Sequence, residues 1–216
     1  MTKLVKKKTS VQTKTFYNPS NYNFNYKKKI KSLYYDIYYT GNLGKGQNLD
    51  KVIDVFKNKK IIQEKIRLFI YGGGKNFESI NMKINQLKFK NVYLNKSISP
   101  KKLKNKIKSA DIFLLKLNNG DGLSKTIPAK FQTYLSFGKP IISINKGAVS
   151  QIILKHKIGF QCNTEKKTNL INTFLEAKKL SQKKYNNIMI NSHKLFFKKF
   201  EINNSCKKLK NYLEEL

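Results

Sequence analysis

The residues best suited to chemistry lie in the segment TIPAKFQTYLSFGKPII, at residues 126–142. Pro128 fits the first position of a helix, because its missing N–H is not needed there. A helix that begins here leaves the N–H groups of Ala129 and Lys130 aimed outward, at the positive end of the helix dipole. With the ammonium of Lys130 in the first turn, the start of this helix is able to hold a phosphate.

Three further segments have the composition of ligand-binding loops. GNLGKGQNLD, at residues 41–50, combines a lysine with glycines whose backbone can approach a ligand closely. GGGK, at residues 72–75, is explained equally well by a tight turn between a strand and a helix. NNGDGLSKT, at residues 118–126, brings Asp121 and Lys125 to the start of the predicted helix.

The spacing of these residues argues against several common kinds of site. Residues 41–50 match neither GxGxxG nor GxxxxGK[ST], so dehydrogenases and P-loop NTPases lose their main support. Lys45 and Lys130 beside a helix start suffice to hold a diphosphate without a divalent metal. No carboxylate cluster predicts a metal site, and Cys162 and Cys206 lack metal-ligand spacing, which indicates thiols in a reducing compartment.

Short apolar strands alternate with helical stretches from Tyr34 onward, and these elements must position the loops. Strands are predicted at residues 34–41, 66–74, 92–94, 111–117, 140–144 and 159–162. Apolar residues at helical spacing predict helices between them, and Gly138 is expected to end the helix that starts at Pro128. This alternation predicts an α/β fold with a doubly wound, Rossmann-like parallel sheet. Ligands of such sheets bind beyond the carboxyl ends of the strands, where these loops are expected.

The pattern divides the chain into three parts. Residues 1–33 show no sustained period and predict a basic arm or linker. Residues 34–200 hold the Rossmann-like domain, and residues 201–216 a C-terminal helix. The tail from Lys166 has apolar residues at helical spacing and no strand pattern, so we expect two or three helices packed over the sheet edge.

The charge balance is extreme, with 45 Lys and Arg against 12 Asp and Glu and a net charge of +33 over 216 residues. Such a chain could bind nucleic acid, but the lysines are spread evenly and arginine is almost absent, so we expect no specific nucleic-acid partner. Contact with anionic membrane is compatible with this charge. Without a signal peptide or a long apolar span, the protein is predicted to be cytoplasmic, with peripheral contact at the inner membrane.

One family shares the ordered set GNLGKGQNLD, IYGGG, NVYLNKSIS, SADIFLLKL and TIPAKFQTYLSFGKPII. The set resembles the C-terminal, donor-binding domain of family 4 retaining glycosyltransferases, which have the two-domain GT-B fold. Bacterial enzymes of surface-polysaccharide and O-antigen assembly with an IPxKxQxYLxxGxP segment are the most similar. The resemblance covers about residues 34–200.

The resemblance implies a nucleotide-diphospho-sugar donor, a glycan or lipid-linked acceptor, and transfer with retention at the anomeric carbon. It implies no metal and no cofactor, in lipopolysaccharide or other surface-polysaccharide synthesis, and it identifies no catalytic residue. The implied diphosphate site comprises Gly41, Asn42, Lys45, Gly46 and Lys130. The implied nucleotide and sugar site comprises Gly73, Gly74, Ser97, Ile98, Asp121, Lys125, Thr126 and Thr133.

The chain departs from the family pattern in two ways. Asn42 stands where many members have an arginine, and Lys125 and Thr133 stand where many have glutamates. A complete enzyme also has an N-terminal domain that binds the acceptor, and residues 1–33 resemble only the segment between the two domains. The resemblance therefore implies either that a separate chain supplies the acceptor domain or that this chain is a truncated product.

Three functions stay open at this point. The chain is a donor-binding domain that acts with a partner, a basic module that binds nucleic acid or anionic membrane, or an inactive truncated remnant. Binding of nucleoside diphosphates separates the first function from the second, and an adjacent reading frame for the acceptor domain separates it from the third.

Overall fold

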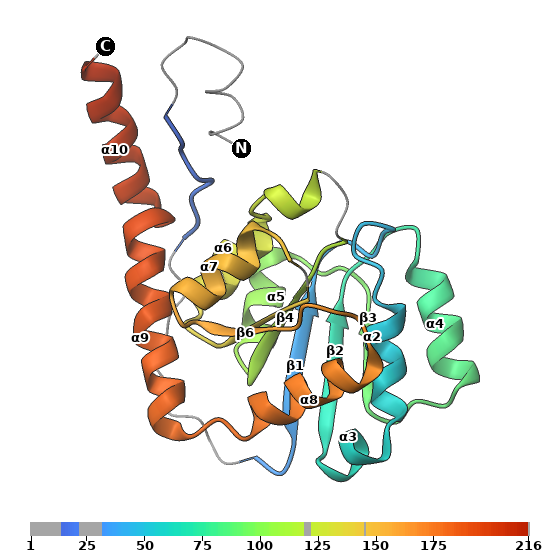
Figure 1. Ribbon diagram of the computed structural model, residues 1–216. Coiled ribbons are helices and arrows are strands. Elements are labelled where there is room, and N and C mark those ends of the chain that lie inside the picture. The colour runs from blue at the N-terminus through green and yellow to red at the C-terminus, as the bar shows by residue number, and fades with distance from the viewer. Residues whose placement is uncertain (1–13, 22–31, 119–121, 145, 216) are drawn as a thin grey trace.

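The structure of the protein, a computed structural model, describes residues 14–21, 32–118, 122–144 and 146–215. Its centre is a six-stranded sheet of parallel strands in the order β3-β2-β1-β4-β5-β6 (Figure 1). The strands are β1 (Tyr35–Thr40), β2 (Ile66–Tyr71), β3 (Val92–Asn95), β4 (Ile112–Lys116), β5 (Ile141–Ile144) and β6 (Gly159–Gln161). The predicted doubly wound α/β fold is confirmed, and each predicted strand is present.

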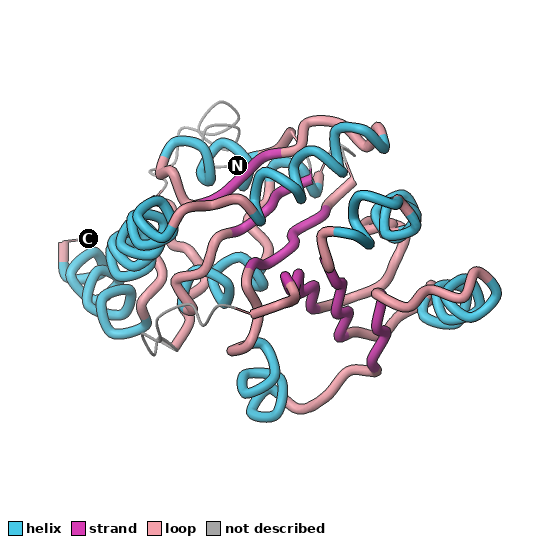
Figure 2. Tube along the Cα trace, turned by 90° about the horizontal axis from the view of Figure 1, so that it is seen from below, coloured by secondary structure: helices cyan, strands magenta, loops and turns pink. Residues whose placement is uncertain are grey.

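Helices cover both faces of this sheet, as the view along it shows (Figure 2). One face packs against α2 (Asp50–Asp54), η1 (Val55–Lys57), α3 (Lys59–Gln63), α4 (Phe77–Gln86) and α8 (Lys167–Lys178). The opposite face packs against α5 (Pro100–Ile107), α6 (Ala129–Ser136), α7 (Ala148–Lys155) and α9 (Gln182–Lys199).

The strand side chains alternate between these two layers. Ile37 and Tyr39 of β1 belong to the first core, whereas Tyr38 between them belongs to the second. Both faces of β1 are therefore covered, which explains why its middle, Ile37 to Tyr39, is apolar and aromatic rather than alternating with polar residues.

The helix α6 starts one residue later than predicted. Pro128 is its N-cap, with an extended conformation at φ −71° and ψ 148°, rather than its first helical residue. Its missing N–H still costs the helix nothing. Gly138 ends the helix as predicted, with a φ of +66°, and the chain then enters β5.

The C-terminal tail forms three helices, α8, α9 and α10 (Ile202–Glu214), in agreement with the prediction. Their placement differs from the expected cover over the sheet edge. The tail runs from one face of the sheet, where α8 packs, to the other, where Leu195 and Phe196 of α9 join the second core. The tail therefore contributes to both cores, one on each face of the sheet.

Part of the predicted arm packs on the tail instead of lying free. Residues 14–21 run beside α9 and α10 in Figure 1. The Ser20 N–H donates to the Phe200 carbonyl at 2.7 Å, and the Tyr17 ring lies 5.2 Å from the Phe200 ring. The domain boundaries at residues 33 and 200 stay predictions. Among the described helices, none combines the length and apolarity needed to cross a bilayer.

Gly138 provides a test of the fold. We expect Gly138→Ala to lower the free energy of unfolding by about 1 kcal/mol or more, because alanine is strained at a φ of +66°. Urea unfolding measures this loss. Gly122→Ala is the control, since a Cβ at Gly122 meets no atom within 4 Å, and we expect it to change stability by less than about 0.5 kcal/mol. Equal losses in the two variants would contradict our explanation of the helix end.

Candidate functional site

Two glycine-rich loops lie side by side at the carboxyl ends of β1 and β2. The Gly41 N–H donates to the Tyr71 carbonyl at 2.9 Å, and the Leu43 N–H donates to the Gly73 carbonyl at 2.7 Å. A Cβ on Gly72 would lie 2.1 Å from the Gly41 carbonyl oxygen. A Cβ on Gly74 would lie 2.2 Å from Oδ1 of Asn42. These two glycines are needed for the loops to touch, so the tight-turn explanation is sufficient for them.

The loop after β3 joins the same place. A Cβ on Gly73 would lie 3.2 Å from Oγ of Ser97, so the predicted residues Gly73 and Ser97 are neighbours. Ser97 is exposed and Ile98 is half-buried. The structure thus brings Gly41, Asn42, Gly73, Gly74 and Ser97 together at one edge of the sheet.

Lys130 reaches this edge from α6. Its Nζ would lie 3.0 Å from a Cβ on Gly41, which places the ammonium directly against the first glycine loop. The ammonium donates to the Tyr39 hydroxyl at 2.9 Å and lies 4.3 Å from the centre of the Tyr39 ring. The predicted meeting of Lys130 with the loop at Gly41 is therefore present.

The charge of Lys130 is not balanced by a carboxylate in the described part of the chain. The residue is half-buried, and its ammonium lies against the hydroxyl and ring of the buried Tyr39. This burial lowers the pKa of the ammonium from 10.5 to about 8. Buried charges in proteins are normally paired, because leaving water is costly for an ion. An ammonium in this position is therefore suited to receive an anion from outside the chain.

The start of α6 adds to this positive field. The helix has eight residues, and no side chain caps its N-terminus. The helix follows β4 through the loop at the carboxyl edge, so its positive end lies at that edge, with Lys130 in its first turn. An uncapped helix start and an unbalanced ammonium together favour a group such as phosphate.

The first glycine loop is also held from its other side. The Asn118 N–H donates to the Gly46 carbonyl at 2.7 Å, and its side-chain amide donates to the Lys45 carbonyl. The contacts therefore fix the backbone of Lys45 and Gly46, while the Lys45 side chain is exposed. A shared diphosphate between Lys45 and Lys130 stays a prediction.

The remaining predicted residues lie further along the β4 to α6 connection. Lys125 is exposed at the end of the short helix η2 (Leu123–Lys125), Thr126 is half-buried, and Asp121 lies outside the described residues. Thr133 is half-buried on α6 and donates to the Ala129 carbonyl of its own helix at 3.4 Å. The sugar and nucleotide roles of Lys125, Thr126 and Thr133 stay predictions.

Two important residues at this edge were not identified from the sequence. Lys116, at the end of β4, is fully buried, and its Nζ lies 2.8 Å from Oε1 of Glu165 and 3.1 Å from Oδ1 of Asn118. Tyr39 holds Lys130. The available signals were a lysine within the apolar run of β4 and a tyrosine two residues before Gly41, and neither signal is specific.

The described residues contain no group of three or more His, Cys, Asp or Glu side chains able to hold a metal ion. Of the two cysteines, Cys162 is buried and Cys206 is exposed, and both are free thiols.

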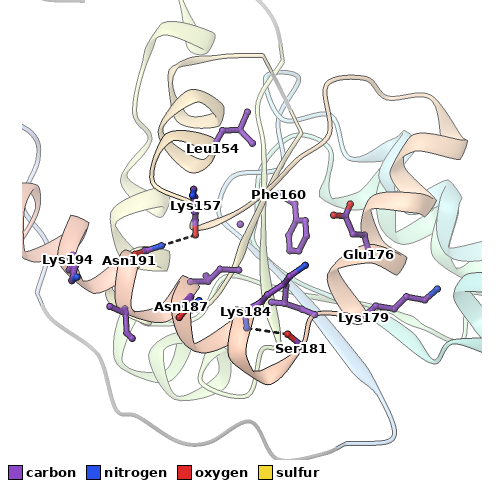
Figure 3. A pocket seen from close by; sticks show the side chains of 14 residues that line it. Leu154, Lys157, Phe160, Glu176, Lys179, Ser181, Lys184, Asn187, Asn191 and Lys194 are labelled. Atoms are coloured by element: carbon purple, nitrogen blue, oxygen red, sulfur yellow. Dashed lines mark hydrogen bonds between the residues drawn. The ribbon is translucent and has the colours of Figure 1, made fainter.

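Two hollows lined by described residues lie elsewhere. The larger, about 950 Å³, lies where β6 and the end of α7 meet α8 and α9, around Phe160 (Figure 3). The second, about 600 Å³, lies between residues 14–19 and the last two helices. Neither is lined by Gly41, Ser97 or Lys130. We place the candidate site at the loops because charge and backbone donors converge there, and Gly41, Asn42 and Ser97 leave it open to solvent.

Solved structures share the fold over most of this chain. Anabaena Alr3699/HepE, in complex with UDP and glucose, superposes with a TM-score of 0.72 at 13% identity, over 94% of this chain and 57% of that protein. A mutant of S. aureus TarM, in complex with Fondaparinux, alpha-GlcNAc-glycerol and UDP, superposes with a TM-score of 0.73 at 13% identity, over 97% of this chain and 41% of that protein. The C-terminal domain of LpcC from Francisella tularensis gives 0.60 at 15% identity, over 78% and 87%.

The chain thus spans about half the length of the HepE and TarM chains. No curated protein sequence matches it. The family described as "Glycosyl transferases group 1" matches residues 23–195, which include both glycine loops, Ser97 and Lys130. With most of its length matched, this chain belongs to the group 1 glycosyl transferases.

Proposed function

We propose that this chain is the donor-binding half of a glycosyltransferase and holds the diphosphate of a nucleotide sugar against Gly41 and Lys130. One observation carries the proposal: the half-buried Lys130 places its ammonium against the glycine loop at a helix start, with no carboxylate partner among the described residues. The UDP present in the HepE and TarM structures supports a nucleoside diphosphate as the anion.

In the proposed reaction, the bond between the anomeric carbon and the β-phosphate oxygen breaks, and the electron pair leaves with the nucleoside diphosphate. The anomeric carbon bonds to the oxygen of an acceptor hydroxyl, whose proton passes to the departing diphosphate oxygen. Negative charge on the diphosphate grows as the bond breaks, so a preorganised cation at Lys130 stabilises the transition state more than the bound donor. Retention at the anomeric carbon and independence of metal belong to this proposal through the family resemblance.

We also propose that a second domain, on the same or on another chain, faces the open side of the site and binds a glycan or lipid-linked acceptor. The half-length match to HepE and TarM supports this arrangement. The described residues of α10 also include exposed apolar side chains that such a domain could cover, with Leu209 at 43% and Leu213 at 60% exposure.

We further propose that the reaction takes place at the cytoplasmic side of the membrane in surface-polysaccharide synthesis. A basic nucleic-acid module is not favoured, because the family match covers residues 23–195.

Replacing Lys130 tests the proposed diphosphate site. Lys130→Met should lower the affinity for UDP, GDP or ADP, whichever the unmodified protein binds, by about 10- to 100-fold, because a charge-assisted hydrogen bond to phosphate is lost. The affinity for the corresponding nucleoside should not change. Calorimetry at low salt measures both.

Lys183→Met is the matched control, since it removes the same charge from an exposed position on α9. An equal loss in both variants would indicate a general charge effect and contradict the site. The proposed function is wrong if the unmodified protein binds none of the three diphosphates.

The pH dependence of binding tests the protonation of Lys130. Its pKa in the free protein is about 8, so the ammonium is charged at pH 7 and loses its proton as the pH rises above 8. A bound diphosphate raises this pKa, so the affinity should fall with rising pH above 8, by up to about tenfold per pH unit. Lys130→Met should show only the titration of the ligand, and an identical pH profile would contradict our assignment.

The proposed second domain predicts binding without turnover. The chain alone should bind donor but release no UDP from UDP-glucose in the presence of lipid or glycan acceptors, because acceptor contacts are missing. A coupled assay for released UDP measures this. Transfer by the chain alone, at a rate abolished by Lys130→Met, would show that no second domain is needed.

A further inference from the structure

The Tyr39 hydroxyl lies between the two parts of the proposed diphosphate site. Tyr39 stands in the central strand β1, and its side chain is fully buried. The hydroxyl receives a hydrogen bond from the Lys130 ammonium at 2.9 Å and donates one to the Asn42 carbonyl at 2.7 Å. The Tyr39 hydroxyl therefore contacts both α6 and the first glycine loop. Tyr39 and Lys130 are 91 residues apart in the sequence.

The bond to Asn42 shapes the loop. It joins residues three positions apart and closes a turn around Gly41, whose N–H is held by Tyr71. The Lys130 ammonium lies close to this turn, 3.0 Å from a Cβ built on Gly41. Loss of the hydroxyl therefore affects the loop as well as the lysine.

The bond to Lys130 orients an ammonium without neutralising it. Burial raises the pKa of Tyr39, and a smaller contribution comes from Tyr134, so the phenol keeps its proton. A neutral oxygen accepts one hydrogen bond and leaves the full positive charge available, whereas a carboxylate at this position would compete with an incoming phosphate. Tyr134, whose own pKa burial raises to about 12, also stays neutral near pH 8.

We propose that Tyr39 is a positioning residue for the diphosphate: its neutral hydroxyl holds the Lys130 ammonium and the Asn42 carbonyl so that the charge of Lys130 faces the Gly41 loop. This inference rests on the proposed function of the site. It assigns no chemical step to Tyr39, which acts through Lys130.

The test uses inorganic pyrophosphate and UDP, titrated by calorimetry at low salt into the full chain. Tyr39→Phe keeps the ring and removes both hydrogen bonds. We expect it to lower the affinity for both ligands by about tenfold. The pH at which binding is lost should also move lower, because the ammonium loses the oxygen that stabilises its charged form. In a Lys130→Met background, Tyr39→Phe should weaken binding less than it does in the unmodified protein, since only the bond to the Asn42 carbonyl remains to be lost.

Tyr35→Phe is the matched control. Tyr35 stands at the opposite end of β1, is 3% exposed, and donates its hydroxyl to the Ala177 carbonyl at 3.1 Å. This variant loses a comparable buried hydrogen bond, so it should lose similar stability while binding pyrophosphate with unchanged affinity and pH profile.

The outcomes separate the two proposals. No binding of UDP or pyrophosphate by the unmodified protein overturns both. If Lys130→Met weakens ligand binding but Tyr39→Phe binds with the affinity and pH profile of the unmodified protein, the positioning role alone is overturned. If Tyr39→Phe does not fold, 4-aminophenylalanine at position 39 still donates to Asn42 but accepts poorly from Lys130. An unchanged pH profile in that variant overturns the role, and a shift to lower pH supports it.

Discussion

The parallel pairing of β1 with β2 is the constraint on which the rest of the site depends. The register sets Thr40 opposite Tyr71, so the chain leaves both strands at the same level. The loops that follow then lie so close that a side chain at Gly72 would overlap the Gly41 carbonyl. Because β1 is central in the sheet, its end is also the meeting point for the connections after β3 and β4. A site at this edge is a consequence of the strand order.

Two lysines at this edge have opposite electrostatic environments. Lys116 is fully buried and paired with Glu165 at 2.8 Å, and through Asn118 it supports the backbone of the first glycine loop. Lys130 has a phenol in place of a carboxylate. The paired lysine is suited to a structural role because its charge is balanced, and the other is suited to binding because its charge is not. The two lysines thus differ in the group that accepts from the ammonium, a carboxylate at Lys116 and a neutral hydroxyl at Lys130.

This contrast explains how a chain with 45 lysines and arginines can still have a specific cationic site. Most lysine side chains on such a surface remain hydrated, and each contributes little to binding an anion. Desolvation makes Lys130 different, because a charge held away from water interacts more strongly with a phosphate that enters its surroundings. The net charge of +33 therefore gives no information on where the site lies.

The order of strands and helices, the class of the sheet and the end of α6 at Gly138 could be predicted from the sequence, because these follow from local periodicity and backbone preferences. It also indicated that Lys130 and the glycines near Gly41 belong to one site, since loops after parallel strands meet at one edge. Which groups touch follows from the folded arrangement alone. Tyr39 and Lys116 are identified through partners distant in the sequence, and the tail packs into the cores on both faces of the sheet. Hydrogen bonds and desolvation depend on distances across the fold, which no local pattern contains.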